Sequence, residues 1–221
     1  IGSIESTIKT PERDEKADTV MHVLRSFDVN KPGIKLKDIK GGVIGGSLTQ
    51  GIFNIGDEIE IKPGIMNEKN KSYEPILTEI TSLGTAAGIV ESVKPGGLVA
   101  IGTKLDPSMT RSDSFIGSVI GKPGTLPDNA TLLKLDVNLF DSAVGSTVDS
   151  TTDLQVKPIQ TGELLRLNIG TAPVLGKVTK VKSSNIEIEL RRPACIFENG
   201  RVAISRKIAE RWRLIGAGIV G

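Results

Sequence analysis

The residues with the clearest capacity for chemistry are basic and lie near the end of the chain. Positions 191–213 hold seven basic residues and only two acidic ones. Arginine can bind phosphate oxygens through two parallel hydrogen bonds, so such a surface suits a nucleic-acid backbone. On spacing alone an alternative stays open, in which the arginines only solubilise strand faces and Trp212 lies in a core. The basic residues are Arg191, Arg192, Arg201, Arg206, Lys207, Arg211 and Arg213.

A glycine-rich stretch at 41–47, GGVIGGS, is the nearest approach to a phosphate-binding loop. That motif requires a lysine after its last glycine, with a helix behind it, and the stretch offers neither. We therefore interpret it as a barrel strand bent by glycines. Residues 28–31, DVNK, resemble a guanine-reading motif at first sight, but Gly33 stands where an aspartate would have to bind the base.

Catalytic and metal-binding constellations are missing from the sequence. His22 is the only histidine and Cys195 the only cysteine, whereas a site of His and Cys ligands needs three or four. A serine triad would have to use His22, which lies between apolar neighbours and is interpreted as structural. The carboxylates at 57–58 and at 187 and 189 are expected on solvent faces. We expect no enzymatic activity and no cofactor in this chain.

Composition limits the function classes further. Hydrophobic residues at 38% and charged residues at 24% allow each half of the 221 residues to bury a core, while 25 glycines and 11 prolines favour turns between strands. The net charge of +2 neither demands nucleic acid nor excludes a local basic surface. The single cysteine favours a reducing, cytoplasmic compartment. No apolar run approaches the roughly 20 residues that span a membrane, so no membrane partner is expected.

The elements that must position these residues are mostly strands. Residues 57–62 and 185–190 alternate aliphatic with charged side chains, which places the two kinds on opposite faces of a strand. Ile1, Ile4 and Ile8 instead have helical spacing, ended by Pro11. Further strands are expected at 20–27, 43–48, 76–83, 98–102, 114–120, 131–138, 163–169, 175–182, 201–206 and 211–220.

Turn signals separate the expected strands and suggest the domain organisation. They include the Pro-Gly pairs at 32–33, 63–64, 95–96 and 123–124, and the Ser-Ser-Asn run at 183–185. Short strands without crossover helices predict an all-β chain of two consecutive antiparallel β-barrels. We expect a helix remnant and linker at 1–18, one barrel at 19–120 and another at 121–221. The first residues have no initiator Met and no signal pattern, so we expect the chain to begin inside something larger.

Several long stretches resemble one protein family, the γ subunits of archaeal and eukaryotic translation initiation factor 2. Residues 25–33 (RSFDVNKPG), 40–47 (KGGVIGGS), 94–103 (KPGGLVAIGT) and 105–108 (LDPS) resemble its second domain. Residues 190–193 (LRRP) and 211–216 (RWRLIG) resemble its third domain. The spacing of Gly51, Gly56 and Asp57 also resembles elongation factor Tu, to which the family is related. Ala217 departs from the pattern, since relatives often carry Trp there.

The resemblance implies barrels of the domain II and domain III type, following a GTPase domain that this sequence does not contain. GTP and Mg²⁺ would belong to that first domain. The family acts in the cytoplasm as the core of a heterotrimer that delivers methionyl initiator tRNA to the small ribosomal subunit. The α subunit is expected to dock on domain II, and the β subunit mainly on the GTPase domain.

The resemblance also implies roles for individual residues. Gly45, Gly46 and Leu48 match the pocket that holds the 3′ end of tRNA, although Leu48 could equally be a core residue. The arginine-rich run, with Lys207, is the candidate for tRNA backbone contacts. The lysine-rich, irregular loops at 31–40 and 63–73 are candidates for α-subunit docking or tRNA phosphates, or are plain surface loops. Their docking candidates are Lys31, Lys35, Lys37, Lys40, Asn67 and Lys69.

Two functions therefore compete. In the first, the chain contributes tRNA-binding surfaces as well as a docking surface for the α subunit. In the second, it is mainly a scaffold for the α subunit and the GTPase domain, with little direct tRNA contact. The modest net charge and the abundant surface loops favour the second function, whereas the arginine-rich run favours the first.

Overall fold

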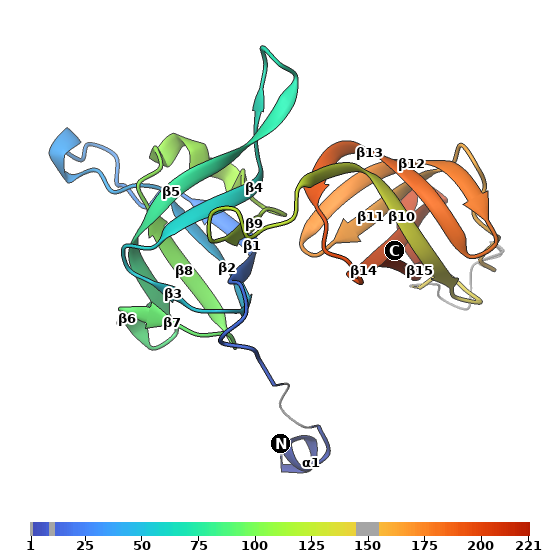
Figure 1. Cartoon of the computed structure of the whole chain (residues 1–221), viewed down its shortest axis with the longest axis horizontal. Helices are drawn as coiled ribbons and strands as arrows, with labels where there is room; N and C mark the ends of the chain where they lie inside the picture. The colour runs from blue at the N-terminus through green and yellow to red at the C-terminus, as the bar shows by residue number, and fades with distance from the viewer. Residues whose placement is uncertain (1, 9–11, 145–154) are drawn as a thin grey trace. The chain divides into compact units, whose positions relative to one another are not determined.

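The chain folds almost entirely as β-structure, with 56% of its residues in strands and 7% in helices, as the sequence predicted (Figure 1). The computed structural model describes residues 2–8, 12–144 and 155–221. A short helix, α1 (Gly2–Thr7), stands at the start, where helical spacing was expected. Residues 12–18 then lead into the first strand, and the carbonyl of Asp14 accepts a hydrogen bond from the N–H of Gly51.

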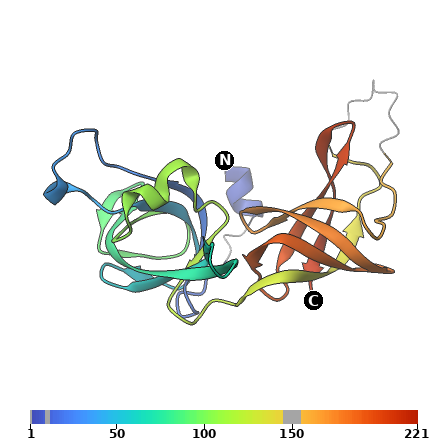
Figure 2. The same ribbon diagram turned by 90° about the horizontal axis from the view of Figure 1, so that it is seen from above.

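Six strands form the first barrel in the order β4-β9-β1-β2-β8-β5, and a further pairing of β4 with β5 closes it. Seen from above, these strands curve round into a closed ring (Figure 2), and Met21, Ile44 and Ile101 on three of them are fully buried. Strand β6 (Gly88–Val90) extends β5, and β3 (Phe53–Asn54) pairs with β7 (Ser92–Val93). The barrel strands are β1 (Val20–Phe27), β2 (Val43–Gln50), β4 (Glu58–Asn67), β5 (Ser72–Thr85), β8 (Leu98–Thr103) and β9 (Val119–Gly121).

The second barrel is closed by six strands in the order β10-β13-β12-β11-β14-β15. Every neighbouring pair in it is antiparallel, with β15 completing the circle against β10. The prediction of two antiparallel barrels is therefore confirmed. The strands are β10 (Asn129–Leu139), β11 (Leu164–Ile169), β12 (Ala172–Lys182), β13 (Asn185–Cys195), β14 (Arg201–Ile208) and β15 (Arg211–Val220).

Alternation along the strands explains both cores. In β13, Ile186, Ile188 and Leu190 are at most 4% exposed, while Glu189 between them faces solvent. Burying an aliphatic side chain of this size contributes about 1.5–3 kcal/mol, so each alternating strand supplies a substantial part of its barrel's stability. Aromatic residues are few, and the second core is built from Leu, Ile, Val and Ala.

Strand β4 breaks this alternation. Ile59 and Ile61 are fully buried as predicted, but Glu60 and Lys62 are buried too. The reason is that the Lys62 ammonium donates hydrogen bonds to the carbonyls of Leu126 and Pro127, at 3.1 Å each. The segment before β10 thus covers the face of β4 that would otherwise meet solvent. A buried ammonium requires such partners, because desolvating it without them is costly.

Two sequence predictions about local structure are wrong. Pro63 and Gly64 do not form a turn but lie within β4, and only residues 68–71 connect it to β5. The carbonyl of Pro63 accepts a hydrogen bond from the Asn129 side chain, and Gly64 has a φ of +85° that favours glycine. A strand was also expected at 114–120. The strand there, β9, begins only at Val119. The residues just before the expected strand form the 3₁₀ segment η2 (Pro107–Asp113).

The residues group into two compact units that interleave along the chain. One draws on 1–59, 77–114 and 120–125, and the other on 60–76, 115–119 and 126–221. We expected a single division of the chain at residue 120. Each observed unit instead includes short segments from the other side of that division. The β4–β5 arm is the largest of these segments, and its buried Lys62 contacts explain why it groups with 126–221.

Candidate nucleic-acid and protein interfaces

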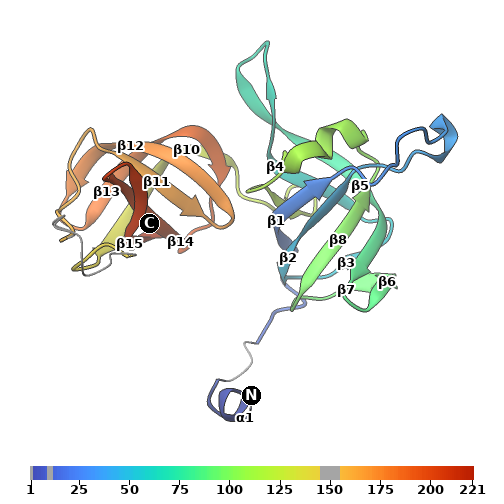
Figure 3. The same cartoon turned by 180° about the vertical axis from the view of Figure 1, so that it is seen from behind.

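The connection between β1 and β2, residues 28–42, is a long loop that we call the basic loop. It extends away from the first barrel and contains a short 3₁₀ turn, η1 (Leu36–Asp38) (Figure 3). Its base is closed by Asn30, whose amide donates to the carbonyl of Lys40 at 2.7 Å and accepts from the Lys40 N–H at 2.8 Å. These two hydrogen bonds join the ends of the loop, as the hydrogen bonds between paired strands would.

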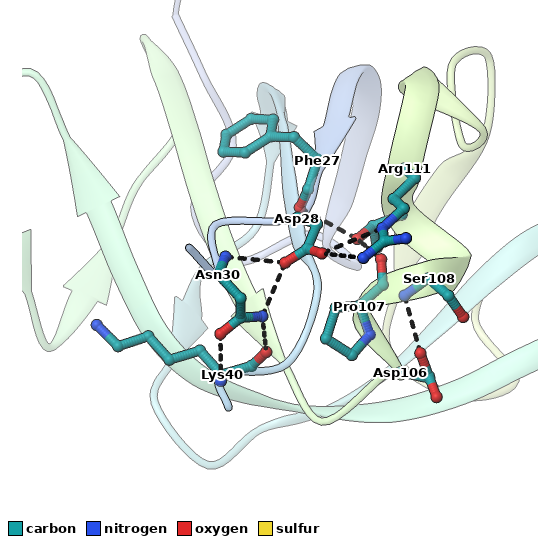
Figure 4. Close-up of polar contacts among 9 residues, drawn as sticks. Phe27, Asp28, Asn30, Lys40, Asp106, Pro107, Ser108 and Arg111 are labelled. Atoms are coloured by element: carbon teal, nitrogen blue, oxygen red, sulfur yellow. Dashed lines mark hydrogen bonds and ion pairs between the residues drawn. The ribbon is translucent and has the colours of Figure 1, made fainter. Parts of the chain in front are cut away.

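Asp28 holds the other side of this junction (Figure 4). One of its carboxylate oxygens accepts from the backbone N–H and the side-chain amide of Asn30, at 2.8 and 2.7 Å. The other accepts from the Arg111 guanidinium at 2.9 and 3.2 Å. The Asn30 N–H and the Arg111 side chain keep the pKa of Asp28 below its ordinary value. The carboxylate is therefore ionised at neutral pH and links the basic loop to η2.

The segment η2 is itself fixed by its sequence. Asp106 caps its first turn by accepting from the N–H of Ser108 at 2.8 Å, and Pro107 takes the first helical position. The Thr110 hydroxyl bonds to the carbonyl of Phe27 in β1. A side chain at Gly42 would lie 2.3 Å from Thr110, so this close approach requires glycine.

A second carboxylate ties η2 to β1. Asp113 accepts from the Arg25 guanidinium at 2.9 Å and from the backbone N–H of Ser26 at 3.0 Å. The Arg25 hydrogen bond, followed by that of Ser26, lowers the pKa of Asp113. Sequence analysis missed Arg25, Arg111 and Asp113. The only local signal was the Asp106-Pro107-Ser108 run, a recognisable helix start.

The basic loop presents its lysines to solvent beside a groove. Lys31, Lys35, Lys37 and Lys40 are all exposed, and none has an ion-pair partner within the described part of the chain. The groove has a volume of about 500 Å³. Its lining includes Asp28, Ile34, Ile39, Asp106, Pro107 and Arg111. The four lysines predicted for docking thus share one loop, and Lys31 also lines the groove.

Asn67 and Lys69, the other docking candidates, lie elsewhere. The structure corrects the prediction of an irregular loop at 63–73, because β4 continues to Asn67 and β5 starts at Ser72. Asn67 donates to Glu74 across this hairpin at 2.7 Å and accepts from the N–H of Lys69 at 3.0 Å. These two residues therefore mark the tip of a regular arm that is separate from the basic loop.

The three residues matched to a tRNA 3′-end pocket differ in orientation. Leu48 is fully buried in the first core, and Gly46 is buried as well. A side chain at Gly46 would lie 2.1 Å from the carbonyl of His22, so packing alone requires this glycine. Gly45 faces outward, and a side chain there would meet nothing closer than 3.8 Å. Of the three residues, only Gly45 leaves backbone open to an approaching ligand.

The arginine-rich run does not form one patch, which corrects the expectation from the sequence. Two strands separate β13 from β14 in either direction around the closed barrel. Arg191 and Arg192 are exposed on β13, and Arg192 bonds to the carbonyl of Pro173 at 2.9 Å. Because residues 196–200 join the end of β13 to the start of β14, Arg201 lies at the same barrel end as Arg191 and Arg192.

The remaining basic residues lie at the opposite end, around the β14–β15 turn. Lys207 pairs with Trp212 across the two strands and forms an ion pair with Glu210. Arg211 is exposed beside them. Arg206 is committed to structure, since it forms an ion pair with Glu163 and donates to the carbonyls of Lys157 and Pro158. Phosphate contacts from Arg206 would have to disrupt these bonds.

His22 and Cys195, the only histidine and the only cysteine, both lie in strands and are largely buried. His22 lies in β1, where burial lowers its pKa. Cys195 is 6% exposed, and burial raises the pKa of its thiol to about 11. Among the described residues, no three His, Cys, Asp or Glu side chains gather closely enough to hold a metal ion. No helix within the described ranges is long and apolar enough to cross a membrane.

The sequence of this chain is similar to those of named proteins. Residues 131–220 match the family model for the C-terminal part of initiation factor eIF2 γ. The chain is 48% identical over 220 residues to translation initiation factor 2 subunit γ of Archaeoglobus fulgidus. It is 50% identical over 222 residues to the protein of that name from Pyrococcus furiosus. The chain belongs to the initiation factor 2 γ family. This confirms the resemblance found in the sequence.

The similarity to initiation factor 2 γ extends over the whole of this chain but not over the whole of its relatives. The match to the Archaeoglobus protein covers 100% of this chain and 51% of that relative. The chain covers 53% of the Pyrococcus protein. It therefore spans about half the length of the curated relatives it matches. The initiation factor 2 γ model itself covers most of the second barrel, from within β10 to the end of β15.

Proposed function

We propose that this chain acts in translation initiation, as the part of an initiation factor 2 γ subunit that binds the α subunit and initiator tRNA. The single observation that carries the proposal is the identity of 46–50% with named γ subunits along essentially the whole chain. In the assembled heterotrimer, the chain would help to deliver methionyl initiator tRNA to the small ribosomal subunit.

The α-subunit role is assigned to the first barrel. The basic loop supports it, because the loop offers four exposed lysines from a base held by Asn30 and Asp28. A loop held in one conformation loses less entropy on binding than a free one. The hairpin tip at Asn67 and Lys69 is a second, separate contact in this proposal.

The tRNA role is shared between the two barrels. Arg191, Arg192 and Arg201 at one end of the second barrel would contact the tRNA backbone. Lys207 and Arg211 at the other end form a separate group, so one tRNA helix need not meet both. Contacts of this type position a nucleic acid without reading its sequence. Outward-facing Gly45 is the candidate for close approach of the tRNA 3′ end.

Catalysis is not assigned to these residues. We propose that GTP and Mg²⁺ bind to another part of the γ subunit, together with most of the β-subunit interface. The sequence supports this, because it lacks both a phosphate-binding loop with its lysine and a guanine-reading motif. GTP turnover by the purified chain would contradict this assignment.

Calorimetry of the purified chain with the α subunit, and with labelled initiator tRNA in parallel, tests the proposal. We expect α to bind with a Kd in the micromolar range or below, and tRNA to bind weakly, because specific recognition needs several surfaces held together. In the heterotrimer, reversing the charges of Arg191, Arg192 and Arg201 should weaken tRNA binding and reduce its salt dependence. Lys134, Lys177 and Lys182, exposed on the same barrel, provide the matched charge-reversal control.

A scaffold with little direct tRNA contact is the second candidate. The observation that favours it is the dispersal of the basic residues to opposite ends of the barrel and the commitment of Arg206 to Glu163. Unchanged tRNA affinity of the trimer after both charge reversals, of 191/192/201 and of 207/211, would select the scaffold. Failure of the folded chain to bind α would reject it.

A further inference from the structure

The first barrel has a second groove, lined by different residues from the groove beside the basic loop. It has a volume of about 390 Å³, and its lining belongs to a single compact unit. We propose that this groove, which we call the acidic groove, binds a protein segment in which a large aliphatic side chain adjoins a lysine or arginine. The proposal goes beyond the α-subunit and tRNA roles assigned above and does not depend on them.

Three apolar side chains from separate elements meet in the acidic groove. Leu77 projects from β5 and is 66% exposed, while Leu105 follows β8 and Pro123 follows β9. A single exposed aliphatic side chain is ordinary, but apolar groups that line one cavity of this volume are typical of binding clefts. The lining of the acidic groove includes Glu58, Leu77, Glu79, Lys104, Leu105 and Pro123.

Strand alternation explains why Leu77 shares this groove with carboxylates. Ile80 is fully buried on the core face of β5, so Leu77 and Glu79 lie on its outer face. The N–H of Ile80 donates to the carbonyl of Asp57 at 3.0 Å, which holds the start of β4 against β5. Glu58, the first residue of β4, therefore lines the same groove.

The charges of the lining give the sign of the partner. Glu79 forms an ion pair with Lys104 at 2.7 Å. Glu58 is exposed, and within the described part of the chain it forms no ion pair. The lining therefore has two carboxylates against one ammonium group. A lysine or arginine of the partner could bond to Glu58 while its methylene groups lie along Leu77.

Hydrogen bonds hold two walls of the acidic groove in place. The N–H of Leu105 donates to the hydroxyl of Thr103 at 3.2 Å. Beside Pro123, both the N–H and the hydroxyl of Thr125 donate to the carbonyl of Lys122, at 3.1 and 2.8 Å. A surface that is already ordered binds more tightly than one that must first order itself.

The lining favours a protein over a nucleic acid as the occupant. The carboxylates of Glu58 and Glu79 would repel a phosphate placed in the groove. Surfaces that bind single-stranded RNA use arginine and aromatic side chains that stack on bases, and the residues that line this groove include neither. The acidic groove is thus opposite in charge to the basic loop, and the two surfaces would take different segments.

Calorimetry of the full 221-residue chain with three synthetic peptides tests the inference. The peptides share Gly-Ser flanks and carry Leu-Lys-Leu, Leu-Glu-Leu or Ser-Lys-Ser at the centre. We expect the first to bind saturably, at least about tenfold more tightly than the other two, and to weaken as salt rises. Equal affinity for the first two peptides, or no binding of the first, would overturn the inference.

Matched variants locate the peptide on the chain. Leu77→Ala should weaken binding of the Leu-Lys-Leu peptide about tenfold, and Glu58→Gln should weaken it about threefold with a smaller salt dependence. The controls are Leu98→Ala, at a side chain 69% exposed on the same barrel, and Glu91→Gln, at an exposed carboxylate; both should leave the Kd within twofold. Circular dichroism checks that each variant folds. Peptide binding that ignores both Leu77→Ala and Glu58→Gln would contradict the proposed site.

Two further measurements separate the other possible occupants. A second copy is one of them, because the exposed run Lys35-Leu36-Lys37 has the proposed chemistry. We expect sedimentation velocity to show a monomer, and self-association lost in both Leu36→Ala and Leu77→Ala would overturn the inference in favour of a second copy. A uridine oligomer should not bind the groove. Oligomer binding that is lost in Leu77→Ala would overturn the inference in favour of RNA.

Discussion

The two barrels close with the same number of strands but use their connections differently. In the second barrel, three of the five connections between strands are only two residues long, at 170–171, 183–184 and 209–210, too few to form a surface of their own. The other two connections are 196–200 and the long segment 140–163. In the first barrel, residues 28–42 and 104–118 are long and are bonded to each other through Asp28 and Arg111, while Thr110 bonds to Phe27 at the end of β1. Short turns fix strand register, whereas long connections can display side chains. We therefore expect substitutions in the cores and two-residue turns to act mainly on stability, and those in the first barrel's long loops to act mainly on binding.

The largest expected effect is the loss of stability on truncating a core side chain, which we expect to be similar in the two barrels. Leu48→Ala and Leu167→Ala each remove a fully buried side chain, one from each barrel. Each should lower the free energy of unfolding by about 2–5 kcal/mol, measured by urea denaturation. If Leu48→Ala instead left stability unchanged and impaired only tRNA binding, its placement in the core would be contradicted.

A pair of neighbouring glycines gives a smaller and sharper contrast. Gly46→Ala would place a methyl group against the carbonyl of His22 and should cost about 1–3 kcal/mol in thermal or urea unfolding. Gly45→Ala has room and should change stability by less than about 0.5 kcal/mol. In the assembled factor, Gly45→Ala should still weaken binding of the aminoacylated tRNA end. Equal stability loss for both variants would remove the distinction between the two glycines.

Loop anchoring should affect binding with little effect on folding. Asn30→Ala removes the side-chain hydrogen bonds to Lys40 and Asp28 that close the basic loop, each contributing about 0.5–1.5 kcal/mol at most. We expect affinity for the α subunit to fall about fivefold in calorimetry, because the loop must then order on binding. The urea midpoint should fall far less than in Leu48→Ala, because the lost bonds lie in a loop outside the core. Asn138→Ala, at an exposed asparagine of β10, is the control and should change neither quantity.

The smallest expected difference between the two barrels is their response to acid, which should break hydrogen bonds locally in the first barrel. The lowered pKa values of Asp28 and Asp113 mean that their stabilising bonds are fully present above the ordinary value of 3.8. They are lost as pH falls below that value and through the lower folded pKa. The amides of Ser26 and Asn30, which bond to these carboxylates, should lose hydrogen-exchange protection first. Simultaneous loss at Leu167 would show a global transition instead.

Much of the fold could be predicted because alternation and turn residues are local signals. The strands around Ile59, Ile186 and Ile204 have side chains whose periodicity follows directly from which face is buried. The continuation of β4 through Pro63 could not be predicted, because the Pro-Gly pair is a local turn signal and the contact of Pro63 with Asn129 is distant in the sequence. The burial of Lys62 has the same cause. Its partners, the carbonyls of Leu126 and Pro127, carry no sequence signature.

The sequence could predict which residues of a candidate site share a loop, but not which residues from different strands share a surface. The lysines of the basic loop adjoin one another in sequence and remain together in space. The arginines from 191 to 213 also adjoin in sequence, yet the strand order places Arg191 and Lys207 on opposite walls. Nearness along a chain implies nearness in space within one loop, but not across strands whose neighbours are set by barrel closure.

The exposed run Lys35-Leu36-Lys37 also has a consequence for the lifetime of the protein. Trypsin-like proteases cut after lysine in accessible chain segments, and this run stands at the tip of the basic loop with Leu36 uncovered. A chain whose loop is covered by a partner would be shielded there, while an orphaned chain would be cut first. The side chains proposed for docking would thereby also mark unassembled copies for removal.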